Sequence, residues 1–304
     1  MAEVQRLTEP LRKEPCDRHK ILDLGELLLG AGDGRGTLKE LNAFLAKCGD
    51  YPRLRRVTLA AHMRLSEWDE ATSEATKLIA SDPYDADFRG WRGLVYEQQH
   101  DWDHAADDYR QALLLKPRLS DVPINLANVY ERQGKTCDAI FPLEQLVFYS
   151  PGIANLGTIR ARIGELARKG NCRGIAGEGK AQIRMNAGEG LVRVTVTLEG
   201  RESGTFVVDT GASYVTVTQA FAKRNGLDLM RAPTVLIATA NGSMTALVVT
   251  IGKVEVQGAK AVRVPAVVVD DLGPSIDGLL GLSFLSRFDF GATGSIFEIA
   301  AKKQ

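Results

Sequence analysis

The sequence predicts two unlike parts, an all-α array of helical repeats followed by an almost wholly β domain. The first half of the chain repeats itself every 34 residues, which is typical of stacked helical hairpins. After Cys172 the glycine-rich stretch RGIAGEG leads into alternating and continuously apolar runs of Val, Thr and Ile, which favour β-strands. At 304 residues the chain is long enough for each part to bury its own core.

The repeat rests on four sets of positions that agree in register. Its second copy, RGWRGLVYEQQHDWDHAADDYRQALLLKP, has small residues where two helices approach, aromatic residues between them, and a proline that ends the second helix. These offsets closely resemble those of the tetratricopeptide repeat, which implies a groove that binds a protein partner. The matching positions are Trp68 and Trp102; Ala71, Ala105 and Ala139; Tyr96 and Tyr130; and Pro83, Pro117 and Pro151.

Extending the period in both directions completes the helical part. HKILDLGELLLG and GTLKELNAFLAKCG become a degenerate opening hairpin, and ANLGTIRARIGELARKG becomes a capping helix. We therefore expect an N-terminal extension at 1–18, helical repeats at 19–172, a linker at 173–180 and the β domain at 181–304.

Two hairpins are expected in the β domain. LVRVTVTLEG and GTFVVDT form the first, around Glu199 to Gly204. TVLIATANGSMTALVVTI forms the second, because Asn241-Gly242 is the strongest short-range signal for a tight hairpin turn. Gly242 is expected to adopt a positive φ in that turn.

The stretch GTFVVDTGAS raises the question of function. Its apolar run predicts a buried strand, and an acid directly after such a strand is costly unless the carboxylate is held and used. Asp-Thr-Gly is also a serviceable turn, so the tripeptide alone leaves both interpretations open. Further along the chain comes DGLLGLSFLSRF, in which two apolar residues and a glycine lead into a short amphipathic helix.

Taken together, these segments make residues 181–304 resemble a single-lobe, retropepsin-like aspartic protease. In that family the Asp-Thr-Gly segment forms one loop of a ψ-shaped crossing, which Leu279-Leu280-Gly281 would thread here. The resemblance implies that Asp209 is the catalytic carboxylate, that Thr210 grips its counterpart across a dimer axis, and that Gly211 lets backbone and substrate approach. It also implies a mobile flap and a substrate cleft that include Ala240, Asn241, Gly242, Leu280 and Gly281.

The chemistry of this family needs two carboxylates and no cofactor or metal. One carboxylate takes a proton from water while the other donates a proton to the scissile carbonyl, so the pair shares one proton. The domain has one Asp-Thr-Gly, which implies a homodimer with one Asp209 from each chain, joined by terminal strands near GKAQIRM and GSIFEIA. The other acids considered, Asp270, Asp271 and Asp277, are interpreted as loop acids.

Two positions depart from the viral members of the family. Ser213 stands where those enzymes usually carry Asp, and Leu282 stands where they usually carry Arg. Those two residues commonly form an ion pair near the dimer interface. The ion pair that supports the viral type of dimer contact is therefore not expected here, whereas the catalytic loop is unchanged.

The favoured hypothesis is an aspartic endopeptidase whose helical array recruits a protein substrate or partner. The alternative is a scaffold that binds a peptide strand in the protease-like lobe without cutting it, since strand addition needs no acid. Retention of Asp209 and Thr210 favours the enzyme. A helical array can also serve only as a rigid spacer.

Composition argues against several other classes. Thirty-eight basic residues balance 38 acidic ones, so no overall field attracts nucleic acid or an anionic membrane. The longest apolar runs, ALVVTI and VPAVVV, fall far short of the roughly 20 residues that span a bilayer. All four histidines lie in the helical half, and Cys16-x-x-His19 lacks a second ligand pair, so no metal site or Ser-His-Asp triad is expected.

The four cysteines fall near helix ends that antiparallel packing brings together. Cys16 and Cys48 flank the opening hairpin, whereas Cys137 begins the second helix of the third repeat and Cys172 follows the capping helix. We expect the disulfides Cys16–Cys48 and Cys137–Cys172, with buried free cysteines as the alternative. Disulfides persist outside the reducing cytosol, which favours a bacterial periplasmic or secreted protein whose export signal is missing from the chain as given; a cytoplasmic protein is the alternative.

Overall fold

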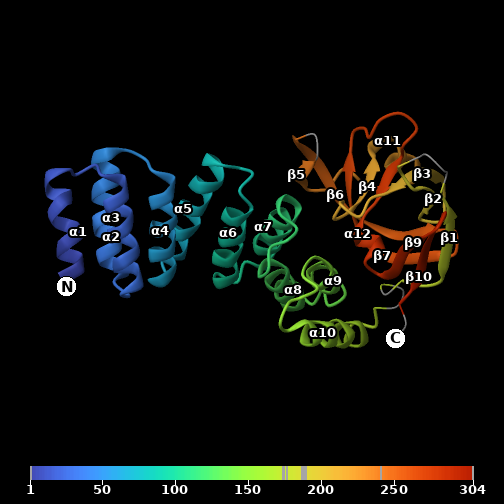
Figure 1. The fold of residues 1–304 in the computed structure, drawn as a ribbon, viewed down its shortest axis with the longest axis horizontal. Helices are drawn as coiled ribbons and strands as arrows, with labels where there is room; N and C mark the ends of the chain where they lie inside the picture. The colour runs from blue at the N-terminus through green and yellow to red at the C-terminus, as the bar shows by residue number, and fades with distance from the viewer. Residues whose placement is uncertain (1, 173–174, 176, 186–189, 240–241, 303–304) are drawn as a thin grey trace. The chain divides into compact units, whose positions relative to one another are not determined.

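The structure is a computed structural model that describes residues 2–172, 175, 177–185, 190–239 and 242–302. The chain divides into two compact units, Met1–Ala112 and Leu113–Gln304. The first unit is helical, and the second contains further helices and the β domain (Figure 1). The expected combination of a tetratricopeptide-like helical part with a β-rich part is therefore confirmed.

Helices pack side by side along the first unit. The expected opening hairpin is confirmed as α2 and α3. The extension at 1–18 contains a helix that the sequence analysis did not foresee, and its Val4, Leu7 and Leu11 pack against the core of the opening hairpin. The helices are α1 (Ala2–Lys13), α2 (Arg18–Gly30), α3 (Gly34–Cys48), α4 (Pro52–Arg64), α5 (Trp68–Ser81), α6 (Ala86–Gln98) and α7 (Trp102–Leu115), the last of which crosses the boundary between the units.

Small residues allow helices of the repeat to approach closely, as the sequence predicts. A Cβ atom on Gly93 of α6 would lie 2.7 Å from the ring of Tyr109 on α7, closer than side chains approach in real proteins. Tyr109 is fully buried, and its hydroxyl donates a hydrogen bond of 2.9 Å to Glu97. A side chain at position 93 would therefore separate α6 from α7.

Three further helices belong to the second unit: α8 (Val122–Arg132), α9 (Ile140–Tyr149) and α10 (Leu156–Lys169). The expected capping helix is α10. Cys137 precedes α9 by three residues instead of beginning it, because residues 136–139 form a turn. The buried face of these helices includes Leu143, Leu146 and Ile159, and Val262 of the β domain packs against the same cluster.

Both expected disulfides are present. Cys16 is bonded to Cys48 and Cys137 to Cys172, across sequence separations of 32 and 35 residues. The first bond joins the start of α2 to the end of α3. The second joins the turn before α9 to the residues after α10, so each bond ties together two ends of an antiparallel pair.

Removing one of these bonds is expected to destabilise its helical pair. In the chain-entropy model a closed loop of this length stabilises by about 4 kcal/mol, so Cys137→Ser with Cys172→Ser should lower the free energy of unfolding by about that amount. Urea unfolding measures the change. Mass spectrometry of the non-reduced protein provides the control, and four free thiols or a different pairing there would contradict the prediction.

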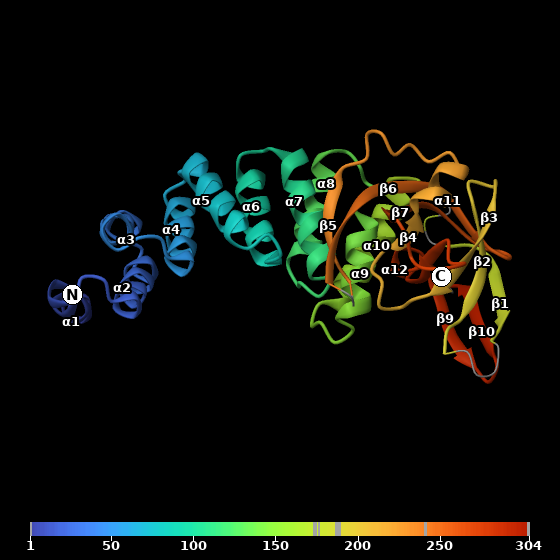
Figure 2. The same cartoon turned by 90° about the horizontal axis from the view of Figure 1, so that it is seen from above.

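The main β-sheet closes on itself. Its strand order is β2-β3-β8-β4-β7-β6-β5, and β2 also pairs with the end of the long strand β6, which makes a barrel of six strands with β5 added outside. Figure 2 shows β5, β6 and β7 on one side and β2 and β3 on the other. The strands are β2 (Arg193–Leu198), β3 (Ser203–Val208), β4 (Val215–Thr218), β5 (Thr234–Thr239), β6 (Gly242–Val256), β7 (Ala259–Val269) and β8 (Gly278–Leu280), with the short helices α11 (Gln219–Arg224) and α12 (Leu282–Leu285).

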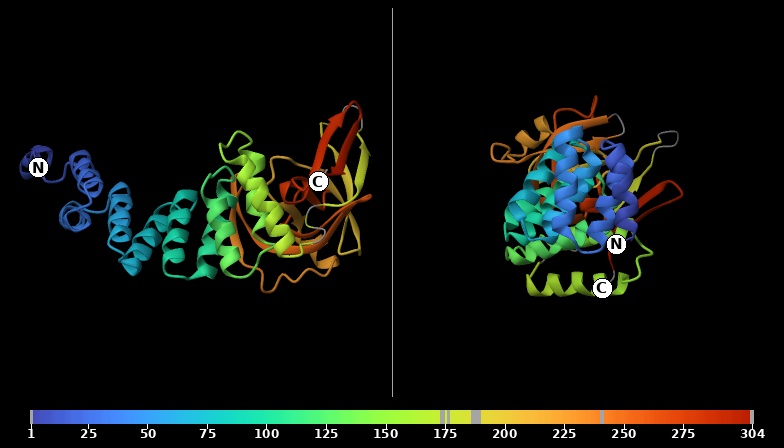
Figure 3. Two further views of the ribbon diagram at one scale, coloured as in Figure 1. Left: turned by 90° about the horizontal axis from the view of Figure 1, so that it is seen from below. Right: turned by 90° about the vertical axis from the view of Figure 1, so that its left-hand side faces the viewer.

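A second sheet of three strands contains both ends of the β domain. Its order is β1 (Lys180–Arg184), β10 (Ile296–Ala301) and β9 (Phe288–Thr293), all antiparallel. The red hairpin in Figure 3 is β9 with β10, and β1 pairs with β10 along its length. Because β10 is the central strand and has both edges paired within the chain, β1 and β9 are the edge strands of this sheet.

Two ionisable groups are withdrawn from water where α9 packs against α12. One carboxylate oxygen of Glu144 on α9 is buried, and Arg287, two residues after α12, is 1% exposed. The Arg287 guanidinium donates to the carbonyl oxygens of Val262 and Arg263, at 2.5 and 3.1 Å. Burial raises the pKa of Glu144 to about 7, and the positive charges of Arg287 and Lys302 oppose this rise only in part.

This carboxyl makes folding stability depend on pH. The folded chain binds the Glu144 proton more tightly than the unfolded chain does, so stability should fall as pH rises from about 4.5 to about 7, by about 3 kcal/mol in total. In Glu144→Gln this part of the pH dependence should disappear. Urea unfolding at several pH values measures it, with Glu165→Gln on the exposed side of α10 as the matched control. Identical pH slopes in the two variants would contradict the assignment.

Candidate functional site

Asp209 is the first residue after β3, at the edge of the barrel. Its backbone amide donates to the carbonyl of Leu280 at 3.2 Å, and its carbonyl accepts from the amide of Ala212 at 3.3 Å. One carboxylate oxygen, Oδ1, accepts a hydrogen bond of 2.8 Å from the Gly211 amide. The side chain is half-buried, whereas Thr210 and Gly211 are exposed. A carboxylate with a defined orientation is thus presented at the surface of this chain.

The Asp209 loop consists of residues 209–214, between β3 and β4. The segment Leu279-Leu280-Gly281 crosses this loop closely. Strand β8 runs parallel to β3 and antiparallel to β4, so it lies between the strands that enter and leave the loop. A Cβ atom on Gly281 would lie 2.1 Å from the carbonyl oxygen of Tyr214. Position 281 therefore has no room for a side chain. The two segments cross as closely as the resemblance implies.

Leu280 contributes through its backbone and not through its side chain. The sequence analysis places it in the substrate cleft, but its side chain is fully buried in the barrel core. Its carbonyl oxygen accepts the amide hydrogen of Asp209. The alternation of side chains along β8 explains this correction, since it directs Leu280 inward while Leu279 stays half-exposed.

The helix after Gly281 also differs from the expectation. Residues Leu282–Leu285 are buried on all sides and not amphipathic, because α12 is enclosed by α9, β4, β7 and β9. This helix anchors the Asp209 loop. The amides of Leu282 and Ser283 donate to the carbonyls of Ala212 and Ser213, at 2.8 and 3.0 Å, and the Ser283 hydroxyl accepts from the amide of Val215 at 2.8 Å.

Asp271 and Asp277, two of the other acids considered, have structural roles. Asp277 accepts hydrogen bonds from the Thr205 amide and from Arg224, both at 3.0 Å. Asp271 accepts from the amides of Leu272 and Gly273 and so forms a turn. Asp209 remains the candidate for chemistry because it follows β3 in the loop that Gly281 crosses.

The expected flap hairpin consists of β5 and β6, with a register that corrects the sequence analysis. Thr239 pairs with Gly242, so Gly242 begins β6 and does not lie inside the turn. The expected turn, centred on Asn241-Gly242, would instead have paired Ala240 with Ser243. Ala240 and Asn241 lie outside the residues that the structure describes. Gly242 has the expected positive φ, at 113°.

Helix α9 contacts the loop that carries Asp209. The hydroxyl of Tyr149 lies 3.1 Å from the Ser213 hydroxyl, and the ring of Phe141 packs edge-on against Tyr214, with 5.3 Å between ring centroids. Sequence reasoning missed these contacts. The one signal in the sequence was that Ser213 stands where viral enzymes carry Asp, but this did not show that Tyr149 is its partner.

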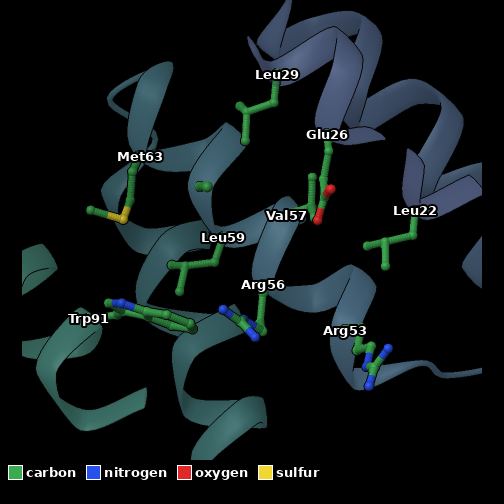
Figure 4. A pocket seen from close by; sticks show the side chains of 10 residues that line it. Leu22, Glu26, Leu29, Arg53, Arg56, Val57, Leu59, Met63 and Trp91 are labelled. Carbon is green, nitrogen blue, oxygen red and sulfur yellow. The ribbon is translucent and has the colours of Figure 1, made fainter. Parts of the chain in front are cut away.

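The helical part contains a groove of about 640 Å³ on the faces of α2, α4 and α6. Its wall is largely apolar, and Arg56 stacks over the ring of Trp91 at 4.8 Å from the centroid. Figure 4 shows Arg53, Arg56 and Glu26 as the charged groups among these apolar side chains. The lining residues are Leu22, Glu26, Leu29, Arg53, Arg56, Val57, Leu59, Ala60, Met63 and Trp91.

The described ranges contain neither a cluster of metal ligands nor a membrane-spanning helix. Within them, no three His, Cys, Asp or Glu side chains are grouped so that they could hold a metal ion. No helix there has the length and apolar character needed to cross a bilayer.

Parts of this chain are similar to known proteins. Residues 194–284, which run from β2 to α12 and include Asp209, match the family model of aspartyl proteases. No curated protein matches the chain. Among solved structures, a retropepsin-like aspartic protease from Rickettsia conorii is 25% identical with a TM-score of 0.33, covering 40% of this chain and 90% of that one. MamA is 19% identical with a TM-score of 0.45 (49% and 81% covered), and a tetratricopeptide protein from Thermus thermophilus is 20% identical with a TM-score of 0.43 (54% and 89% covered).

Proposed function

We propose that this chain is an aspartic endopeptidase in which the Asp209 carboxylates of two protomers share one proton. The observation that carries this proposal is the Asp209 loop itself, which begins at the end of a buried strand and is crossed by Gly281. One carboxylate takes a proton from water, and the protonated partner donates to the scissile carbonyl. Thr210 is the residue that would contact the partner loop.

Dimerisation follows from the stoichiometry of the reaction. One chain supplies one Asp209, and the carboxylates of Asp271 and Asp277 are engaged in their own hydrogen bonds. Strands β1 and β9 are the edges of the three-stranded sheet, so one of them is the contact surface for the second chain. Sedimentation during turnover tests this point, since an active species that remains monomeric would exclude the shared site.

The helical part is proposed to recruit the protein substrate. Its groove combines apolar walls with charged side chains, which is the composition expected of a surface that selects a peptide segment. The two disulfides favour an oxidising compartment, and a periplasmic or secreted enzyme is the proposal that this supports.

Incubation of the purified chain with a peptide library between about pH 4 and 7 tests the enzymatic proposal. Cleavage that is absent in Asp209→Asn supports it. Peptides that bind without being cut at any pH would instead favour the non-catalytic scaffold. Because catalysis needs a singly protonated pair, activity should fall at both ends of a sufficiently wide pH range.

The flap supplies a further prediction. A β-branched residue at the positive φ of Gly242 is strained by roughly 1–3 kcal/mol, so Gly242→Val should distort the start of β6 next to the hairpin tip. Turnover is expected to fall more than thermal stability does. Ser243→Val is the matched control, because Ser243 is exposed on the same strand and has an ordinary φ. Equal losses of turnover and stability in Gly242→Val would show that the hairpin is core and not a lid.

A further inference from the structure

We propose that Tyr149 of helix α9 is a positioning residue that holds the Asp209 loop through its contact with Ser213. This role rests on the proposed function for its effect on catalysis, but its effect on the loop is measurable without activity. The two hydroxyl oxygens lie 3.1 Å apart although the residues are 64 positions apart in the sequence. The side chain that departs from the viral pattern thus has a partner within its own chain.

The rest of the loop is already held by its backbone. Asp209 is bonded to Leu280, and the carbonyls of Ala212 and Ser213 accept the first amides of α12. These bonds fix the loop on the side of the barrel. The Ser213 side chain is directed to α9 instead, so Tyr149 restrains the loop from a second side.

Helix α9 is well suited to act as a rigid support. It touches Tyr214 through Phe141 and Ser213 through Tyr149, eight residues or about 12 Å apart along the helix axis. Its last turn is fixed as well, because Phe148 stacks on Phe290 of β9 and Arg118 lies over the Tyr149 ring. Neighbouring residues of the catalytic loop are therefore tied to two separate points on one helix.

The position of a catalytic carboxylate must be accurate to well below 1 Å, since a misplacement of that size can cost about a hundredfold in rate. Tyr149→Phe removes one hydroxyl while keeping the ring and its packing. We expect kcat to fall about 3- to 10-fold, the effect of one neutral hydrogen bond, with KM nearly unchanged. Amide exchange at Ala212, Ser213 and Tyr214 should become faster in the same variant.

The experiment compares Tyr149→Phe, Ser213→Ala and the double variant in the full chain. If the two hydroxyls act on each other, the double variant should lose no more activity than either single variant. Ser213→Thr keeps a hydroxyl and should retain most of the activity. Tyr84→Phe is the matched control, because Tyr84 is 52% exposed in the helical part.

Two results would overturn the positioning role. One is unchanged kcat in Tyr149→Phe, and the other is unchanged amide exchange in the loop. A wild-type chain that cuts no peptide would overturn the proposed function alone, because the exchange measurement still decides whether Tyr149 holds the loop.

Discussion

Replacing Asp209 by Asn should reduce peptide hydrolysis by about a thousandfold or more, because the amide cannot take a proton from water or share one with a partner. The fold should change little. Asp209 Oδ1 accepts one hydrogen bond, from the Gly211 amide, and the carbonyl oxygen of Asn can accept the same bond. Initial rates with a cleaved library peptide measure the loss, and urea unfolding measures the stability.

Asp271→Asn is the matched control for this substitution. Asp271 also accepts amide hydrogens of its own turn through Oδ1, but it lies in another loop, so activity should be retained. Peptidase activity that survives in pure Asp209→Asn protein would remove Asp209 from the mechanism. Loss of activity together with loss of the fold would mean that the carboxylate is needed for structure first.

Gly281→Ala is expected to have the second-largest effect. The new methyl group would meet the backbone carbonyls of Tyr214 and Ala212, at 2.1 and 2.8 Å, and backbone cannot move aside as the end of a flexible side chain can. Overpacking of this kind costs typically 1–3 kcal/mol or more. The residues forced to shift belong to the Asp209 loop, so we expect activity to fall by about a hundredfold or more.

Gly164→Ala on α10 provides the control, since a methyl group there meets no atom within 4 Å. Alanine also has a higher helix propensity than glycine, so the Gly164→Ala variant should be slightly more stable than the wild type. Peptidase rates and unfolding curves of both variants check the prediction. Near-normal activity in Gly281→Ala would show that the two loops can separate without loss of function.

Local sequence patterns were sufficient to predict several elements of the structure. The 34-residue period predicted the helical array, and the positions of the cysteines at helix ends predicted both disulfides. The 34-residue period and the cysteine positions are readable because each depends on stereochemistry within a short segment or on a repeated pattern. The crossing of the Asp-Thr-Gly segment by the later Leu-Leu-Gly was implied by the resemblance of these two segments to those of retropepsin-like proteases.

Other features depended on which surfaces meet in the folded chain. The closure of the barrel by β2 and β6, the complete burial of α12 and the inward direction of Leu280 each follow from long-range packing. The one-residue shift at Gly242 belongs to the same class, because strand register is set by pairing along the whole hairpin.

The sequence was thus enough to predict where the Asp209 loop lies, since the Asp-Thr-Gly and Leu-Leu-Gly segments together resemble those of a known family. The supports of that loop were decided by the tertiary structure. Tyr149 and Ser213 are ordinary residues in their own segments, and so are Glu144 and Arg287. They interact only because α9 packs on the β domain, and no short-range pattern records which helix face will meet which loop.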